Sequence, residues 1–389
     1  MRRYLPQIGA ALALYILSAG ISFAVFSALG TGRPGGPAIV SPIAPDISPA
    51  GQDGLSGLPR TEACPLNGKL YSKPEREMWE TRRPLAVMLE NSTDARPHSG
   101  LSKADIVYES VAEGGITRFL AVFYCGVAEN TELAPVRSAR TYYLDWVSEY
   151  DALYNHVGGA GRCSDPTVDT RAKALCQIGQ YGIKDLDQFG ISFPDCYRNP
   201  DRTGKPVATE HQMVCLSENL YDIAEERGWT NVDEEGVSWD EDFTPWKFKE
   251  DAAPSDRGSV MTADLYFWKG YDGYDVTWQY DKELNEYKRL TGGEIHKDLL
   301  TDTQLTAKNV VVQFTAETGS VDEHKHLLYK TIGGGDAIIF MDGKAIEGSW
   351  SKKSRTNRTK YLDDKGKEIS FNPGIVWIEI VPAGNTVTF

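Results

Sequence analysis

The sequence lacks the motifs of several common chemistries. It contains no C-x-x-C pair and no suitably spaced set of cysteine and histidine, so we expect no zinc centre and no other metal site. A phosphate-cradling Walker loop is absent, and neither Ser138 nor Ser164 lies in a G-x-S-x-G or S-x-x-K motif. We find no internal repeat and no sustained heptad, and we expect no cofactor. P-loop chemistry therefore has no support, and serine hydrolysis has little.

Basic residues are also outnumbered. The chain has 41 Lys and Arg against 55 Asp and Glu, a formal net charge of −14, with a pI near 5.0. A general binder of nucleic acid or of anionic membranes needs a basic field, so we expect no nucleic-acid partner. Two local charge runs, acidic at 233–242 and basic at 352–360, are interpreted as solvated loops because isolated charge runs usually lie on the surface.

An uncharged apolar stretch occupies residues 8–29 and has about the length of a bilayer-spanning helix. Arg2 and Arg3 precede it and the next charge is Arg33, so the positive-inside tendency places the rest of the chain outside the cytoplasm. A cleaved secretory signal is the alternative, although its apolar core is usually shorter. We expect a cytoplasmic stub and transmembrane anchor over residues 1–29, a single-pass attachment to the cytoplasmic membrane, and an extracytoplasmic body.

The remaining chain divides into three parts. Residues 30–60 are rich in proline and glycine, a composition that forms a tether rather than a packed core. The body is longer than one typical domain, so we expect a domain at 61–250 and another at 251–389. The first mixes helix-like and strand-like segments, including apolar runs at 84–90 and 119–125 and expected helices at 139–149 and 218–227.

Beyond residue 251 the pattern is that of strands, which occur for example at 276–280, 310–314, 337–341 and 376–380. Asp342-Gly343 is a dipeptide typical of hairpin turns. The expected fold is therefore a mixed α/β (α+β) first domain followed by a mostly antiparallel β second domain, after the N-terminal transmembrane helix.

Six cysteines occur in a chain that we place outside the cytoplasm, where disulfides persist. We expect at least some of them to be bridged. Six cysteines allow fifteen pairings, and the sequence does not choose among them.

Arginines and glycines supply the candidate ligand site. Arg137 and Arg140 flank Ser138 at the expected start of the 139–149 helix, where free helix N–H groups and guanidinium groups can face one anion. Arg96 and Arg118 would enlarge this pocket, although the same arginines would equally pair with Glu109, Glu113 and Asp145 inside the fold. The expected ligand-binding set is Arg96, Arg118, Arg137, Ser138, Arg140, Gly158 and Gly159.

Three residues are candidates for acid or base catalysis. His156 closes a strand before a glycine-rich loop, and His211 follows Glu210, although a lone histidine is more often structural. Glu113 lies four residues after Glu109, and with Asp105 or Asp145 such a pair would give the two carboxylates of a glycosidase. Because acidic residues are abundant in this chain, surface charge or pairing with arginine is the competing interpretation.

Six blocks of the chain carry a family resemblance, namely Ala95–Leu101 (ARPHSGL), Ala104–Glu109 (ADIVYE), Glu113–Phe119 (EGGITRF), Pro135–Arg140 (PVRSAR), Glu149–Tyr154 (EYDALY) and Asn372–Gly374 (NPG). Through these blocks the chain resembles the YerB-like putative lipoprotein family of bacteria, over about residues 83–389. The resemblance implies an exported, membrane-associated bacterial envelope protein with an α/β first part and a β-rich second part, and it names no reaction. No cysteine directly follows the apolar segment, so we expect attachment through the helix rather than through a lipid.

The leading interpretation is a module that binds an anionic envelope ligand, such as a cell-wall glycan or its peptide, through the arginine cluster. A hydrolase or lyase acting on an envelope polymer, with His156 or Glu113 as acid or base, is the second interpretation. A scaffold for envelope proteins is the third. Convergence of the arginines, Glu113 and His156 on one open concavity would favour the first two.

Overall fold

The computed structural model of the chain describes residues 58–127 and 129–389. The predicted anchor at residues 8–29 and nearly all of the predicted tether at 30–60 lie outside the described residues. Within the described ranges, no helix combines the length and the apolar character that crossing a membrane requires.

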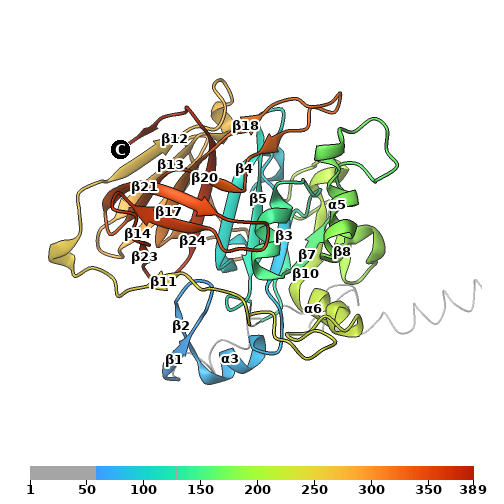
Figure 1. The fold of residues 1–389 in the computed structure, drawn as a ribbon, viewed down its shortest axis with the longest axis horizontal. Coiled ribbons are helices and arrows are strands. Elements are labelled where there is room, and N and C mark those ends of the chain that lie inside the picture. Colours follow the sequence, from blue (N-terminus) through green and yellow to red (C-terminus); the bar gives the residue numbers. More distant parts are fainter. Residues whose placement is uncertain (1–57, 128) are drawn as a thin grey trace, which may run out of the picture. The chain divides into compact units, whose positions relative to one another are not determined.

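A mixed sheet of ten strands is the main element of the fold (Figure 1). Its neighbouring strands β3, β7 and β8 run parallel to one another, and so do β4, β24 and β17. Across the sheet the order is β22 (Lys360–Asp363), β21 (Lys344–Lys352), β20 (Gly333–Met341), β17 (Asn309–Thr315), β24 (Val376–Pro382), β4 (Ile106–Glu113), β5 (Ile116–Phe123), β3 (Leu85–Glu90), β7 (Leu153–His156) and β8 (Lys184–Asp187).

The central strands are buried on both faces, which explains their nearly continuous apolar sequences. Every residue of β3 (LAVMLE) is buried, as is every residue of β24 (VWIEIVP) except its last. The apolar runs at 84–90, 119–125, 310–314, 337–341 and 376–380 therefore predicted strands correctly.

The sheet is continuous across the expected domain boundary at residues 250/251. Strand β24 of the second segment pairs in parallel with β4 of the first, with Val376 opposite Ile106 and Ile378 opposite Tyr108. The described residues, 58–127 and 129–389, accordingly lie in one compact unit. The two segments differ in composition as expected, because the α-helices of the described chain all lie in the first and the second is β-rich.

A second sheet packs against the first. Its inner face carries Trp278, whose ring meets that of Trp377 edge-on at 5.3 Å and whose Nε1 donates to Glu379 Oε1 at 2.9 Å. The order of its strands is β15 (Glu294–Ile295), β14 (Glu286–Thr291), β13 (Val276–Asp281), β12 (Thr262–Leu265) and β25 (Val387–Thr388), with β16 (Thr306–Ala307) also paired to β14.

Short strands form four further small sheets. They are β1 (Arg60–Ala63) with β2 (Leu70–Ser72), β6 (Glu132–Leu133) with β10 (Met213–Leu216) and β9 (Cys196–Arg198), β11 (Lys247–Phe248) with β23 (Ser370–Phe371), and β18 (Glu317–Thr318) with β19 (Leu328–Tyr329).

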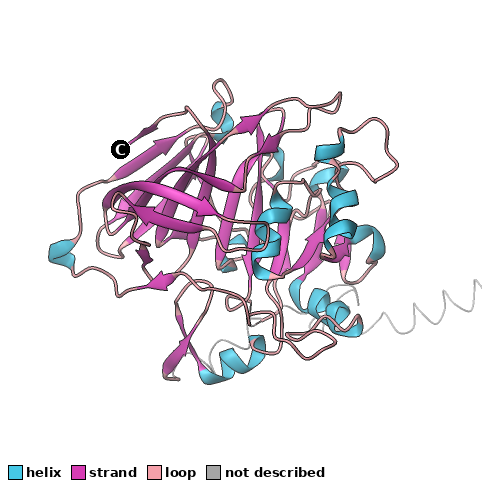
Figure 2. Cartoon of the chain, in the orientation of Figure 1, coloured by secondary structure: helices cyan, strands magenta, loops and turns pink. Residues whose placement is uncertain are grey.

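The described residues contain four α-helices, α3 (Lys73–Trp79), α4 (Tyr143–Val147), α5 (Ala174–Tyr181) and α6 (Ser217–Glu226) (Figure 2). Helix α6 agrees with the prediction at 218–227. The prediction of a helix from Ala139 is wrong, because α4 begins only at Tyr143. The reason is that Arg137 N donates to Met88 O at 2.8 Å and Ala139 N donates to Gly158 O at 2.9 Å, so this segment is held extended between two strands.

All six cysteines are bridged, which confirms the expectation of disulfides. The pairs are Cys64–Cys125, Cys163–Cys176 and Cys196–Cys215. Cys196 and Cys215 face each other across β9 and β10, and Cys163–Cys176 fastens α5 to the loop before it. All three disulfides thus lie in the first segment.

Candidate functional site

Most of the candidate residues meet at one edge of the ten-stranded sheet. Strands β3, β7 and β8 are parallel, so their carboxyl ends, at Glu90, His156 and Asp187, lie together (Figure 1). The segment 136–139 bridges to Leu89 and to Gly159 at the same edge. Strand β5 starts there too, because Arg118 is opposite Glu90 in the antiparallel pair. Carboxyl ends of parallel strands are a common location for ligand sites in α/β sheets.

Glu113, at the end of β4, neutralises two of the candidate arginines. Its Oε2 lies 3.2 Å from Arg118 Nη2, and its Oε1 contacts Arg140 Nε. The arginines also donate to backbone carbonyls, Arg118 to Ser138 O at 3.0 Å and Arg140 to Ala139 O at 2.6 Å. These three side chains form a closed ionic cluster within the fold.

The same cluster fixes the protonation state of Glu113. Burial by itself raises the pKa of this carboxyl, but the charges of Arg118 and Arg140 and the hydrogen bond from Arg140 outweigh it and lower the pKa to about 2. Glu113 is therefore ionised at neutral pH and holds no proton to donate, which argues against its predicted use as a general acid.

Arg137 is bound differently. Its Nε lies 3.4 Å from Glu90 Oε2, and no hydrogen bond to its guanidinium group is found within the described residues. Its backbone is fixed by the bond to Met88 and by Val157 N, which donates to Arg137 O at 3.1 Å. The side chain is 27% exposed. A rigid backbone thus presents a guanidinium group that retains most of its donors.

His211 contacts the same carboxylate, with Nδ1 2.8 Å from Glu90 Oε2. It lies in a 3₁₀ turn just before β10, and it is mostly buried. Glu90 therefore lies between a guanidinium and an imidazole, so His211 joins the candidate residues at this edge.

His156 is enclosed. Its Nε2 lies 2.9 Å from Asp185 Oδ1, its Nδ1 lies 2.7 Å from Gly158 O, and the ring is fully buried. The N–H of Gly158 is occupied as well, because it donates to Asp187 Oδ1 at 2.8 Å. This geometry makes His156 a support for the glycine loop, and it leaves the Gly158 N–H without capacity for a developing oxyanion.

Gly158 adopts φ +56°, and the lack of a side chain there makes room for Phe189. A Cβ at this glycine would lie 2.9 Å from Phe189 Cε2. Phe189 itself is 73% exposed, which is unusual for a phenylalanine. We call Glu90, Arg137, Gly158, Phe189 and His211 the carboxyl-edge site. Ser138 and Gly159 flank it, with Ser138 O bound to Arg118 and Gly159 bridged to Ala139.

Arg96 serves the packing of the two sheets. Its Nε and Nη2 donate to Asn91 Oδ1 at 2.9 Å and Asn91 O at 3.1 Å, and its Nη1 donates to Gly273 O at 2.9 Å. Burial lowers its pKa to about 10. Each of its nitrogens is thus bonded within the protein, and the Tyr274 ring covers the group at 5.2 Å.

The expected glycosidase carboxylates are likewise internal. Glu109 is fully buried and binds Arg289 Nη2 at 2.5 Å, and Arg289 Nη1 binds Glu379 Oε1 at 2.9 Å. Asp105 is also fully buried and accepts from the backbone N–H groups of residues 124–126. These carboxylates stabilise the interior, and neither is open to a substrate.

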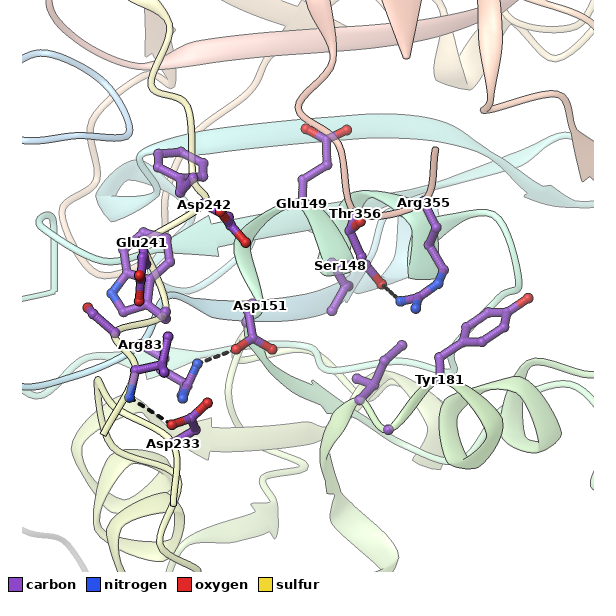
Figure 3. A pocket seen from close by; sticks show the side chains of 18 residues that line it. Arg83, Ser148, Glu149, Asp151, Tyr181, Asp233, Glu241, Asp242, Arg355 and Thr356 are labelled. Atoms are coloured by element: carbon purple, nitrogen blue, oxygen red, sulfur yellow. Dashed lines mark hydrogen bonds and ion pairs between the residues drawn. The ribbon is translucent and has the colours of Figure 1, made fainter. Parts of the chain in front are cut away.

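Two cavities contain none of the predicted site residues. One, of about 430 Å³, lies between α3 and α6. The other, of about 310 Å³, lies at the amino ends of β3, β7 and β8, and we call it the amino-edge cavity (Figure 3). Its walls combine residues of the acidic run, such as Asp233 and Asp242, with Arg355 of the basic run. Those runs had been interpreted as solvated loops, and within the basic run Lys352 and Arg358 are in fact buried against Glu149.

Comparison with known proteins identifies the family. Residues 71–230 match the family described as "Protein of unknown function (DUF3048) N-terminal domain", and residues 264–378 match its C-terminal domain. The chain belongs to the DUF3048 family. This agrees with the resemblance to YerB-like proteins noted in the sequence.

A curated relative and a solved structure support the assignment. The chain is 31% identical over 324 residues to "Putative lipoprotein YerB" of Bacillus subtilis (strain 168), covering 82% of this chain and 86% of that protein. The crystal structure of the YerB protein from Bacillus subtilis superposes with a TM-score of 0.66 and 27% identity, covering 85% of this chain and all of that one. The DUF3048 fold is therefore shared across most of the chain.

Proposed function

We propose that this DUF3048 protein is attached to the outer face of a bacterial cytoplasmic membrane and binds an anionic ligand of the cell envelope at the carboxyl-edge site. A wall glycan or its peptide has the required chemistry. Two observations support the location, namely the apolar segment at 8–29 behind Arg2 and Arg3, and three disulfides, which persist in oxidising compartments. The lipoprotein name of the Bacillus relative points the same way.

One difference among the arginines carries the ligand proposal. Arg96, Arg118 and Arg140 donate to backbone carbonyls, to Asn91 or to Glu113, whereas among the described residues Arg137 has only a 3.4 Å ion pair with Glu90. A guanidinium that keeps its donors can make charge-assisted, bidentate bonds to a carboxylate or phosphate. Arg137 is therefore the residue that contacts the anion, and the other three position the loops around it.

Phe189 suits the same ligand. Its exposed ring lies beside Gly158, whose carbonyl accepts from Ala139 two residues after Arg137. A site that offers both an exposed ring and a guanidinium suits a ligand that has an apolar surface and a negative group, and an acidic sugar or a short peptide meets both conditions.

The test compares Arg137→Ala with Arg171→Ala, the latter an exposed arginine that pairs only with Asp169. Full-length protein in detergent is incubated with purified cell-wall material, and the bound fraction is measured at rising salt. We expect binding to fall about tenfold or more for Arg137→Ala, the size of one lost charged hydrogen bond, and to remain unchanged for Arg171→Ala. Equal wall binding by the two variants contradicts the proposal.

The location is tested separately. A reporter enzyme that is active only outside the cytoplasm is fused after Phe389 and compared with one that is active only inside. We expect activity from the first fusion alone, because the charges flank the apolar segment asymmetrically. Activity of the cytoplasmic reporter would overturn the proposed topology.

A further inference from the structure

The amino-edge cavity is formed by segments that lie far apart in the sequence. Arg83 lines it just before β3, Asp151 just before β7 and Ile183 just before β8, while the loops at 233–243 and 355–356 close its sides. Its volume of about 310 Å³ is within the roughly 300 to 1,000 Å³ of small-molecule sites.

One wall carries a cation with neutral partners. Arg355 Nη1 donates to Ser148 Oγ at 2.7 Å, and the guanidinium lies 4.4 Å from the centre of the Tyr181 ring. No carboxylate pairs with Arg355 within the described residues. The hydroxyl and the ring hold the group in place without neutralising its charge.

The opposite wall carries anions. Glu241 and Asp242 lie on the far side of the cavity from Arg355 (Figure 3), both are exposed, and no ion pair or hydrogen bond to either carboxylate is found in the described part of the chain. Phe243 and the buried Trp239, from the same loop, also line the cavity and supply apolar surface. The cavity therefore places the guanidinium of Arg355 opposite the unpaired carboxylates of Glu241 and Asp242. Asp233 is a third acidic residue of the lining, and its carboxylate accepts the backbone N–H groups of Glu235 and Val237.

The floor carries a paired arginine. Arg83 is almost fully buried and pairs through Nη1 with Asp151, but its Nε has no hydrogen-bond partner among the described residues. Asp151 also binds Lys184 at 2.6 Å. Because Nε is itself buried, Arg83 and Asp151 contribute a neutralised ion pair to the lining of the cavity and no free charge.

From this arrangement we propose that the amino-edge cavity binds a small zwitterion, namely an amino acid or a short peptide with free ends. Its carboxylate binds Arg355, its ammonium group binds Glu241 and Asp242, and its short side chains contact Trp239 and Phe243. The acidic side chains of Glu241 and Asp242 would repel a purely anionic ligand, and Arg355 would repel a purely cationic one. The mixed walls therefore select a molecule that carries both charges. This site is separate from the carboxyl-edge site.

The experiment titrates full-length protein, in detergent, with trialanine by isothermal calorimetry. Two capped peptides are titrated in parallel, N-acetyl-trialanine, which lacks the ammonium group, and trialanine amide, which lacks the carboxylate. We expect trialanine to bind and each cap to weaken binding by about tenfold or more, because each removes one charged hydrogen bond. Equal affinities for free and capped peptides, or no binding of trialanine at millimolar concentration, would overturn the proposal.

Variants assign the two ends of the ligand. Arg355→Gln should weaken trialanine binding and abolish the penalty of the C-terminal amide, and the double variant Glu241→Gln/Asp242→Asn should abolish the penalty of N-acetylation. Lys353→Gln is the matched control, because Lys353 is exposed, belongs to the same basic run and does not line the cavity. Thermal unfolding checks that each variant is folded. Arg137→Ala should leave trialanine binding unchanged, which keeps this test independent of the carboxyl-edge site.

Discussion

The two ends of the parallel strands β3, β7 and β8 differ in how their charges are used. At the carboxyl ends, Arg118 and Arg140 are neutralised by Glu113, whereas Arg137 has a 3.4 Å ion pair with Glu90 and no side-chain hydrogen bond among the described residues. At the amino ends, Arg355 and the carboxylates of Glu241 and Asp242 face one cavity, and no ion pair of any of the three is found in the part of the chain that the structure describes. At the carboxyl ends, charged residues that are close in sequence thus form ion pairs with one another. At the amino ends, charged residues that are far apart in sequence line one cavity and can contact a ligand.

The difference teaches that the number of charges is a poor guide to a ligand site. A ligand site needs charges that have no partner inside the fold. A charge that is already in an ion pair must give up that pair to bind a ligand, and the lost interaction reduces the affinity. Four predictions test this difference between neutralised and unpaired charges, and they are ordered from the largest to the smallest expected effect on stability.

Arg140→Ala should destabilise the protein most. It leaves the partly buried Glu113 with one cationic partner, and breaking such a pair costs about 3 kcal/mol. Urea unfolding of the variant and of wild type gives the difference in free energy of unfolding. A change below about 0.5 kcal/mol, typical of an ordinary surface substitution, would show that the cluster at the carboxyl ends is not structural.

Acid should weaken the same cluster. The folded pKa of Glu113 is about 2, below its ordinary 4.5, so its contribution is complete above pH 4.5 and is lost as the pH falls from 4.5 towards 2. The loss should reach about 2 to 3 kcal/mol. The loss is obtained by measuring the free energy of unfolding between pH 5 and pH 2 for wild type and for Glu113→Gln. If the two proteins lose stability in parallel over this range, the lowered pKa of Glu113 is contradicted.

Arg137→Ala should change stability by less than about 1 kcal/mol, because it removes a long, partly exposed ion pair and leaves Glu90 in contact with His211. Calorimetric or urea unfolding of Arg137→Ala, Arg140→Ala and wild type, measured under the same conditions, gives the comparison. A loss as large as that of Arg140→Ala would make Arg137 a structural residue too, and the proposed anion site would lose its basis.

Arg355→Gln should have the smallest effect, about 0.5 kcal/mol or less, since the half-buried Arg355 contacts, among the described residues, only a hydroxyl and an aromatic ring. Lys353→Gln provides the baseline for removing one positive charge from the same run. If Arg355→Gln instead unfolds at a clearly lower temperature than Lys353→Gln, its guanidinium holds the loop and the contrast between the two edges disappears.

Local features of the sequence predicted the strands and one helix well. The apolar runs at 84–90 and 376–380 are strands β3 and β24, and the segment at 218–227 is α6, because burial on both faces or on one helical face imposes a regular pattern on neighbouring residues. The helix expected from Ala139 failed because its first residues bond to Met88 and Gly158, and these partners lie outside the local window.

By itself, the sequence determined the β-rich second segment, the mixed first segment, the presence of disulfides and the family, since each depends on composition or on short patterns. Tertiary structure alone decided which cysteines pair, that Glu113 neutralises Arg118 and Arg140, and that residues near 240 and near 355 line one cavity. The physical reason is that the availability of a charge depends on its neighbours in space. In a sheet whose adjacent strands β4 and β24 are about 270 residues apart, those neighbours come from distant parts of the chain.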